Sequence, residues 1–274
     1  MWMKWSIPLF LALALQAGPP KGTLVIMGGG DETPGIVTAF AQAAGGKGGL
    51  LGIIPTPSAE PDRSYKPWKA VFDQAGLASV PLDVRRREDS SLPELLAAAG
   101  RCTAFWFTGG DQARVGDKIV GTPLHKLIQE KYRDGAGVGG SSAGAAIMSR
   151  IMLTGDDRNG KEALVEMGPG AYKTREGMGF LPEGVIVDQH FLRRNWQNRL
   201  LSLMMEHPDH LGLGIDEATA LVVKDGVAKV VGRTGVLVFD PQGMSLQGGG
   251  FRNLTIHFLR EGQGIDLSTR KLLP

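Results

Sequence analysis

The sequence predicts an α/β protein whose mostly parallel sheet is flanked by helices, with an antiparallel extension near the carboxyl end. Short, continuously apolar runs alternate with helical stretches along the 274 residues, which is typical of strands buried on both faces of a sheet. Glycine accounts for 40 residues, about twice its usual share, without the period of collagen. Glycine at this density indicates many tight turns between strands and loops. We expect a single domain over residues 22–274.

The first 17 residues resemble a signal peptide. Lys4 supplies a positive charge, residues 7–15 form a short apolar core, and residues 15–17 resemble a small-residue cleavage site. An apolar run of about ten residues is too short to span a bilayer, which takes about 20. The alternative is a buried amino-terminal helix. We therefore expect an exported protein, secreted or periplasmic, with no membrane segment after removal of the signal.

The first expected elements alternate between strand and helix. Strands are expected at residues 23–27, 50–54 and 104–107, each followed closely by glycine or proline. Thr122 and Pro123 begin a helix to about Arg133, because threonine caps helix starts well and proline suits the first helical position. The remaining elements of this part are a strand at 136–139, a helix at 143–152 and a long loop at 155–179.

The last part of the sequence contains a further helix and several strands. We expect a strand at 185–187, a helix at 193–206, and strands at 211–215, 220–223, 227–231, 236–239 and 254–259. The turn residues 224–226 (Lys-Asp-Gly) lie between two of these strands and predict a hairpin. Such hairpins account for the expected antiparallel extension.

Charge and motifs exclude several classes of function. With 30 basic and 28 acidic residues and no clustered basic surplus, the chain is not a general nucleic-acid binder. The run Gly28-Gly29-Gly30 does not match the dinucleotide fingerprint, because Thr33 occupies the last glycine position. His207 and His210 have a spacing seen in metal sites, but the sequence offers no third ligand. We expect no metal, no cofactor and, since Cys102 is the only cysteine, no intrachain disulfide.

Polar and glycine-rich groups follow the ends of five expected strands, at residues 28–31, 108–112, 140–144, 188–190 and 216–217. Ligands of open α/β sheets bind outside the carboxyl ends of the strands. The segment Gly140-Ser-Ser-Ala-Gly144 also matches G-x-S-x-G between a strand and a helix, the setting of a nucleophile elbow. Such a turn presents the Ser142 hydroxyl, and the Ala143 N–H can serve an oxyanion. The alternative is a plain helix cap with small residues for close packing.

A serine nucleophile needs a base and an orienting acid. Of the five histidines, only His190 directly follows an expected apolar strand. Asp216 and Glu217 follow another strand, and the residues alone leave open which carboxylate orients the imidazole. Gly110 is the expected second oxyanion donor, because bare glycine lets the main chain approach a carbonyl. The arginines that follow His190 predict a carboxylate-bearing substrate, the alternative being a solvated helix face.

Four motifs in this order resemble the cyanophycinases, serine exopeptidases related to the aspartyl dipeptidases. They are Phe107-Thr-Gly-Gly-Asp-Gln112, Gly140-Ser-Ser-Ala-Gly144, Asp188-Gln-His-Phe191 and Gly214-Ile-Asp-Glu-Ala-Thr219. The resemblance implies a class I glutamine-amidotransferase-like fold and a homodimer. It implies hydrolysis of cyanophycin, a polyaspartate whose side chains carry arginine, to β-aspartyl-arginine dipeptides. It also implies that Ser142 is the nucleophile, His190 the base and Glu217 the orienting acid.

The resemblance further implies a substrate pocket, and this chain departs from the family pattern there. The implied pocket residues are Gln112, Asp188, Gln189, Arg194 and Arg199. Trp196 takes the place of a commonly found middle arginine, so we expect it to replace a carboxylate contact with a stacking surface for a guanidinium or aromatic group. The alternatives are an exported serine peptidase for other acidic or isoaspartyl peptides, or a catalytically inactive binding homologue.

Overall fold

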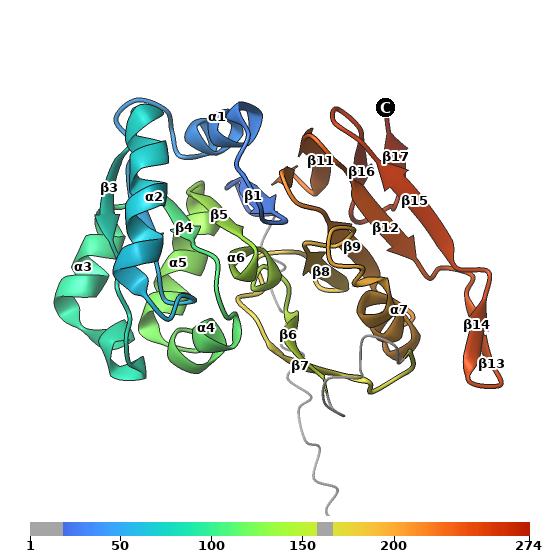
Figure 1. The fold of residues 1–274 in the computed structure, drawn as a ribbon. Coiled ribbons are helices and arrows are strands. Elements are labelled where there is room, and N and C mark those ends of the chain that lie inside the picture. Colours follow the sequence, from blue (N-terminus) through green and yellow to red (C-terminus); the bar gives the residue numbers. More distant parts are fainter. Residues whose placement is uncertain (1–18, 158–166) are drawn as a thin grey trace, which may run out of the picture.

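The computed structural model describes residues 19–157 and 167–274 (Figure 1). The expected signal peptide, residues 1–17, lies outside this range. The elements of the first part are β1 (Leu24–Met27), α1 (Pro34–Ala43), β2 (Leu50–Ile54), α2 (Pro61–Gln74), β3 (Ala78–Pro81), the 3-10 helix η1 (Arg87–Ser91), α3 (Pro93–Arg101), β4 (Ala104–Phe107), α4 (Ala113–Lys118), α5 (Pro123–Asp134), β5 (Gly137–Ser141), α6 (Ala143–Ala146) and β6 (Ile151–Asp157). Those of the second are β7 (Tyr172–Glu176), β8 (Val185–Gln189), α7 (Gln197–Glu206), β9 (Leu211–Ile215), β10 (Thr219–Lys224), β11 (Val227–Gly232), β12 (Val236–Asp240), β13 (Ser245–Gln247), β14 (Gly250–Arg252), β15 (Thr255–Leu259), β16 (Gly264–Asp266) and β17 (Leu272–Leu273).

The central sheet has nine strands among the described residues, in the order β17-β16-β11-β10-β1-β5-β4-β2-β3. Every neighbouring pair from β1 to β3 is parallel. Every pair from β1 to β17 is antiparallel, including the expected hairpin of β10 and β11. The predicted α/β fold, with a parallel sheet flanked by helices and an antiparallel extension, is therefore confirmed.

A second sheet contains two of the strands whose ends carry candidate site residues. The strands expected at residues 185–187 and 211–215 do not join the central sheet. They form β8 and β9, which pair in parallel within a four-stranded sheet of order β15-β12-β9-β8. Helix α7 packs on this sheet through a cluster that includes Leu200, Met204 and Phe239 (Figure 1). The site is thus built where the ends of strands from two sheets meet.

Burial on both faces explains the continuous apolar strands. In β1, Leu24 and Ile26 join the cluster that contains α5 and the four-stranded sheet, while Val25 and Met27 join the cluster of α1 and α2. Successive side chains of a strand point to opposite faces, so a strand covered on both sides needs apolar residues at every position. All four of these side chains are fully buried.

Two expected elements in the middle of the chain differ from those in the structure, and contacts with distant residues explain the differences. The helix expected at 143–152 ends at Ala146, because the Met178 and Phe180 N–H groups donate to the carbonyls of Ile147 and Met148, at 2.7 and 3.0 Å. The expected loop at 155–179 contains β7, which pairs with β6. Residues 158–166 of that loop lie outside the described range.

The helix expected at 193–206 begins only at Gln197. Asn195 adopts a left-handed backbone conformation with φ of 54°, which an α-helix does not accommodate. The Asp216 carboxylate accepts hydrogen bonds from the Leu192 and Arg193 N–H groups, at 3.1 and 2.9 Å, and so fixes the turns before the helix. Within the described ranges, no helix is long and apolar enough to cross a membrane.

Candidate active site

Ser142 lies in a strained turn between β5 and α6. Its backbone angles are φ 56° and ψ −110°, outside the regions that non-glycine residues usually occupy. A Cβ on Gly140 would lie 2.6 Å from the Gly144 carbonyl oxygen, and one on Gly144 would lie 2.3 Å from that of Phe107. Both motif glycines are therefore required for the turn to pack against itself and against β4. Backbone strain of this kind is concentrated at functional sites.

Three side chains form a hydrogen-bonded chain at this turn. The Ser142 Oγ lies 2.8 Å from His190 Nε2, and His190 Nδ1 lies 2.6 Å from Glu217 Oε1. With Nδ1–H donating to the carboxylate, Nε2 is left to accept the serine hydroxyl proton. The imidazole is 8% exposed and the Glu217 side chain 29% exposed. This is the arrangement that activates a serine hydroxyl as a nucleophile.

The glycine run after β1 supports the imidazole. The His190 N–H donates to the Gly28 carbonyl at 2.8 Å, and the Ala218 N–H donates to that of Gly29 at the same distance. A Cβ on Gly29 would lie 2.2 Å from His190 Cε1. Sequence reasoning assigned Gly29 no role. The available signal was a run of three glycines at the same sheet edge as the serine.

Asp216 and Glu217 have separate structural functions. Glu217 contacts the imidazole, whereas the Asp216 carboxylate binds the main-chain N–H groups of the turn after His190. The side chain that faces the base is therefore the one implied by the family resemblance. Asp216 holds the segment on which the base is carried.

The candidate oxyanion donors, the main-chain N–H groups of Ala143 and Gly110, belong to two segments near Ser142. Ala143 begins α6, so its N–H has no acceptor within the helix. A Cβ on Gly109 would lie 3.5 Å from Ser142 Cβ, which places Gly109, the residue before Gly110, beside the serine. Gly110 has φ of 142° and passes over the Pro57 carbonyl oxygen, only 2.3 Å from where its own Cβ would lie. Only glycine allows this path of the main chain.

The four polar pocket residues other than Arg194 are buried, and three are engaged within the protein. The Arg199 guanidinium pairs with the Asp188 carboxylate through two contacts, one of them 2.6 Å between Nε and Oδ2. Their side chains are 5% and 1% exposed. The Gln112 amide nitrogen donates to the Leu153 carbonyl at 2.7 Å. Gln189 Oε1 is buried and has no hydrogen-bond donor among the described residues.

Trp196 lies against arginines of the same chain. The Arg199 Cζ is 3.3 Å from the centre of the indole ring, and the Arg194 Cζ is 4.9 Å from it. The ring also meets the His190 imidazole at 88°, with centroids 6.2 Å apart. The stacking surface expected for a substrate is therefore already in contact with two guanidinium groups.

Burial lowers the pKa of His190 below its usual value. The positive charges of Arg194 and Arg199 lower it further, while the hydrogen bond to Glu217 opposes the shift. The imidazole is consequently neutral at neutral pH and able to accept a proton. The described residues contain no group of three or more His, Cys, Asp or Glu side chains that could hold a metal ion.

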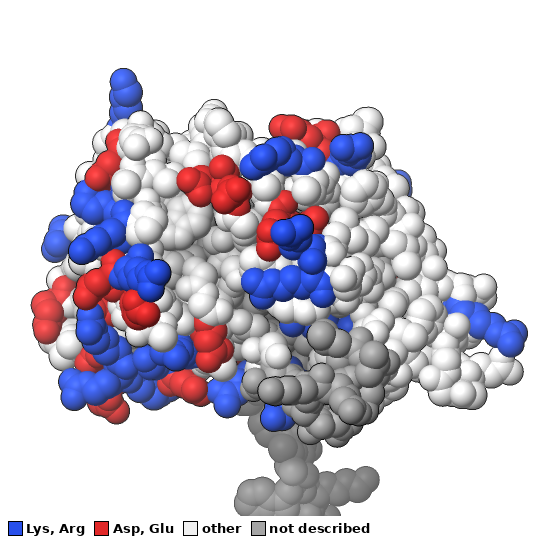
Figure 2. Space-filling view, viewed as in Figure 1, with Lys and Arg blue, Asp and Glu red and all other residues white. Residues whose placement is uncertain are grey.

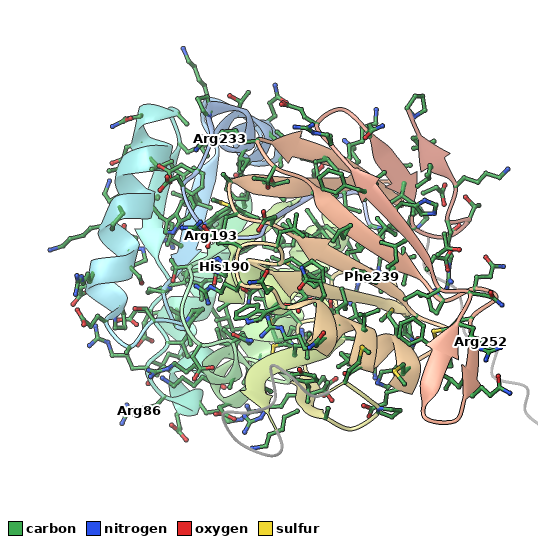
Figure 3. All side chains as sticks on the ribbon, turned by 45° about the vertical axis from the view of Figure 1, so that its right-hand side comes forward. Arg86, His190, Arg193, Arg233, Phe239 and Arg252 are labelled. Carbon is green, nitrogen blue, oxygen red and sulfur yellow. The ribbon has the colours of Figure 1, made fainter. Side chains whose placement is uncertain are left out.

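An exposed arginine lies close to the base. His190 and Arg193 lie near each other in the middle of the molecule in Figure 3. Arg193 Nε is 4.0 Å from Glu217 Oε2, and its side chain is 75% exposed. In Figure 2 the visible face is hollowed near its middle, and basic and acidic side chains are interspersed around the hollow.

Several known proteins are similar to this chain over most of its length. The chain is 36% identical over 267 residues to a cyanophycinase of Geminocystis herdmanii, covering 92% of this chain and 95% of the relative. It is 35% identical over 269 residues to a cyanophycinase of Synechococcus elongatus, covering 92% and 81%. A crystal structure of a peptidase from an acI-B1 Actinobacterium has the same fold, with a TM-score of 0.70, 24% identity, and coverage of 91% and 98%.

Residues 24–231 match the model of the family described as "Peptidase family S51". This range contains the serine, the histidine and the glutamate described above. The match extends from the first strand of the central sheet to its hairpin. The resemblance to cyanophycinases is confirmed by these relatives. The chain belongs to peptidase family S51 and is a hydrolase of the serine-peptidase type.

Proposed function

We propose that this protein is a serine exopeptidase that hydrolyses cyanophycin to β-aspartyl-arginine dipeptides. The observation that carries the proposal is the hydrogen-bonded chain of Ser142, His190 and Glu217 at the strand ends. The names of its relatives, at 34–36% identity over most of their length, support the choice of substrate.

The proposed reaction begins when Ser142 Oγ attacks the carbonyl carbon of the scissile amide. His190 Nε2 takes the hydroxyl proton and then delivers it to the leaving amine, which leaves an acyl-enzyme. Water, activated by the same imidazole, attacks the acyl carbon and releases the acid with return of the proton to Ser142. Glu217 keeps the imidazole in the tautomer that accepts at Nε2.

The tetrahedral intermediate carries a negative oxygen that needs donors. We assign these to the main-chain N–H groups of Ala143 and Gly110. Removal of one such donor from a comparable site costs about 3–4 kcal/mol in activation free energy. Main-chain donors have the advantage that the fold holds them before the substrate arrives.

The test is release of soluble dipeptide from insoluble cyanophycin by the wild type and by Ser142→Ala. The wild type should release β-aspartyl-arginine, and Ser142→Ala should lose at least about a thousandfold in turnover. The free energy of unfolding of the variant should change little, since the half-buried hydroxyl is removed without opening a cavity. A near-wild-type rate for Ser142→Ala would remove the assignment of the nucleophile.

A second candidate substrate class is other acidic or isoaspartyl peptides. It is favoured by Trp196, whose indole already contacts the Arg194 and Arg199 guanidinium groups of the protein and so is less available to the arginine side chains of cyanophycin. Parallel assays with cyanophycin and with α- and β-aspartyl dipeptides distinguish the two. Turnover of the dipeptides without release from cyanophycin would select the second class.

An inactive binding homologue is the third candidate. Labelling of Ser142 by a fluorophosphonate probe, and its loss in Ser142→Ala, would exclude it. A protein that neither reacts with the probe nor turns over any of these substrates would support it.

We also propose that the protein is a single domain exported by its first 17 residues and that it forms a homodimer. The positively charged and apolar amino-terminal sequence supports export. Fractionation of cells that express the full sequence tests export, and sizing of the purified protein by light scattering tests the homodimer.

A further inference from the structure

Three arginines follow the proposed base, and their surroundings differ. Arg199 is buried and paired with Asp188. Arg193 is exposed and lies 4.0 Å from a Glu217 oxygen. Arg194 is exposed and has no acidic partner within ion-pair distance among the described residues. Of the three, Arg194 is therefore the guanidinium whose charge no carboxylate of residues 19–157 or 167–274 balances.

The indole of Trp196 is the common neighbour of these groups. It lies 3.3 Å from Arg199 Cζ and 4.9 Å from Arg194 Cζ, both within the range of cation–π attraction. It also contacts the edge of the apolar cluster that contains Phe191 and Leu200, which fixes the ring on the protein. The ring thus connects the apolar cluster, the buried Arg199–Asp188 ion pair and the exposed Arg194 guanidinium.

Cation–π attraction can keep the Arg194 guanidinium near His190. Arg194 and Arg199 are like charges near one imidazole, and both lower the pKa of His190. Without the ring, hydration of the exposed guanidinium would favour an Arg194 side chain that turns into solvent. The negative face of an indole attracts the guanidinium and offsets part of the gain from hydration.

We propose that Trp196 is a positioning residue that holds the Arg194 guanidinium beside His190, where a substrate carboxylate meets it. The proposal rests on the proposed role of His190 as the base, and it assigns to Trp196 a function other than direct stacking on substrate. The substrate class that fits is a peptide with a carboxylate close to the scissile amide. Arg199 stays with Asp188 and does not contact that carboxylate.

The groups around the imidazole make the expected effect specific. Glu217 follows β9, and Arg193, Arg194 and Arg199 follow β8, whereas the neighbours from β1 and β5 are the uncharged Gly29 and Ser142. Loss of the indole lets the Arg194 guanidinium move away from His190. It also admits water to the imidazole. Both changes favour the imidazolium form, so they act in the same direction on the titration of His190.

The first measurement follows the His190 imidazole by NMR titration, with the signal assigned by its absence in His190→Gln. Trp196→Leu keeps apolar bulk and removes the π face, and it should raise the pKa of His190. Trp196→Phe restores a π face and should return the titration toward that of the wild type. Trp196→Met replaces Trp196→Leu if the leucine variant fails to fold. This measurement needs no substrate, so it stands even if cyanophycin is not hydrolysed.

The second measurement is a double-mutant cycle on KM, with any peptide that the wild type hydrolyses, at a pH where His190 is neutral. Trp196→Leu should raise KM roughly three- to tenfold with little change in kcat, the range expected for a cation–π contact. The double variant Trp196→Leu with Arg194→Ala should have the KM of Arg194→Ala alone, because the ring acts through that arginine.

Arg193→Ala is the matched control, because Arg193 is a neighbouring exposed arginine without a cation–π contact to Trp196. Its effect on KM should be the same with and without the indole. Independent effects of Trp196→Leu and Arg194→Ala in the cycle, or an unchanged His190 titration in a folded Trp196→Leu protein, would overturn the proposal. Absence of hydrolysis of cyanophycin alone would overturn the proposed substrate and leave the titration result as the test of Trp196.

Discussion

His190 and His125 are both shielded from solvent, but their hydrogen-bond partners differ. Burial lowers the pKa of both imidazoles. His190 is bonded to two side chains, the Glu217 carboxylate and the Ser142 hydroxyl. His125 is bonded to two main-chain groups, accepting from the Gly121 N–H at 3.0 Å and lying 2.9 Å from the Met178 carbonyl oxygen.

The difference shows that burial alone does not make a base. A main-chain carbonyl can only accept, so His125 Nε2 carries its proton there, and Nδ1 must accept from Gly121. Neither ring nitrogen of His125 faces a group that can give up a proton. His190 Nε2 faces a hydroxyl that can. A lowered pKa therefore identifies both residues, and only the partners separate the catalytic candidate from the structural one.

Exchange of each histidine for glutamine tests this comparison most strongly. His190→Gln should lower kcat/KM by at least about ten-thousandfold, because no group remains to take the Ser142 proton. His125→Gln should leave kcat/KM near the wild-type value. It should lower the free energy of unfolding by about 1–2 kcal/mol, because hydrogen bonds at a half-buried site are lost. Steady-state kinetics and urea unfolding measure the two quantities.

We therefore expect His190→Gln to lose activity and His125→Gln to lose stability. Equal losses of activity in the two variants would show that the assignment of the base depends on general burial rather than on partners. A stable, active His190→Gln protein would contradict the proposed mechanism outright.

The carboxylate beside the base gives the next largest effect. Glu217→Gln keeps the shape of the side chain but removes the charge that stabilises the imidazolium, and in serine peptidases a change of this kind costs up to about ten-thousandfold in kcat. Asp216→Asn is the matched control, since its oxygen can still accept from the Leu192 and Arg193 N–H groups. We expect Asp216→Asn to retain far more activity. The reverse order in kinetic assays would exchange the assigned roles of the two acids.

Much of the fold could be predicted because its signals are local. The strands at 24–27, 50–54 and 104–107 lie within one residue of their expected bounds, since each is an apolar run with a glycine or proline one or two residues after its end. Thr122 caps α5 through its side-chain oxygen, and Pro123 is the first helical residue, as expected. The end of α6 had no local signal, because Met178 and Phe180, some thirty residues away, take the carbonyls that another turn would use.

The site was partly predictable for the same reason. The G-x-S-x-G turn and the histidine after a strand are short patterns, and the structure brings Ser142 and His190 together. The choice between Asp216 and Glu217 needed the direction of two adjacent side chains, which spacing does not encode. Likewise, Asp188 lies on a strand and Arg199 on a helix, and their pairing depends on how these elements pack. The sequence therefore could not show whether Arg199 binds Asp188 or a substrate.

Gly29 offers a smaller perturbation of the same base. Gly29→Ala would place a methyl group 2.2 Å from His190 Cε1 and displace the ring, and a misplacement of about 1 Å costs about a hundredfold in rate. Gly45 is the control, because it also has a positive φ, of 94°, but its Cβ would meet no atom within 4 Å. Gly45→Ala should cost about 1 kcal/mol in stability with activity retained. Equal activity of the two variants would show that Gly29 does not position the imidazole.

The pH dependence is the mildest test, since it changes no residue. The pKa of His190 lies below the usual value of about 6.5. As pH falls through that pKa, the imidazole becomes protonated and cannot accept the Ser142 proton, so kcat/KM should fall along an acid limb centred below about 6.5. Burial also lowers the pKa of His125, so its effect is on the free energy of unfolding. Below about pH 6.5 the unfolded chain binds this proton more readily than the folded chain does, and stability is therefore lost as the pH falls. An acid limb centred above 6.5, in a protein whose thermal midpoint is constant over that range, would show that His190 is not held neutral by its surroundings.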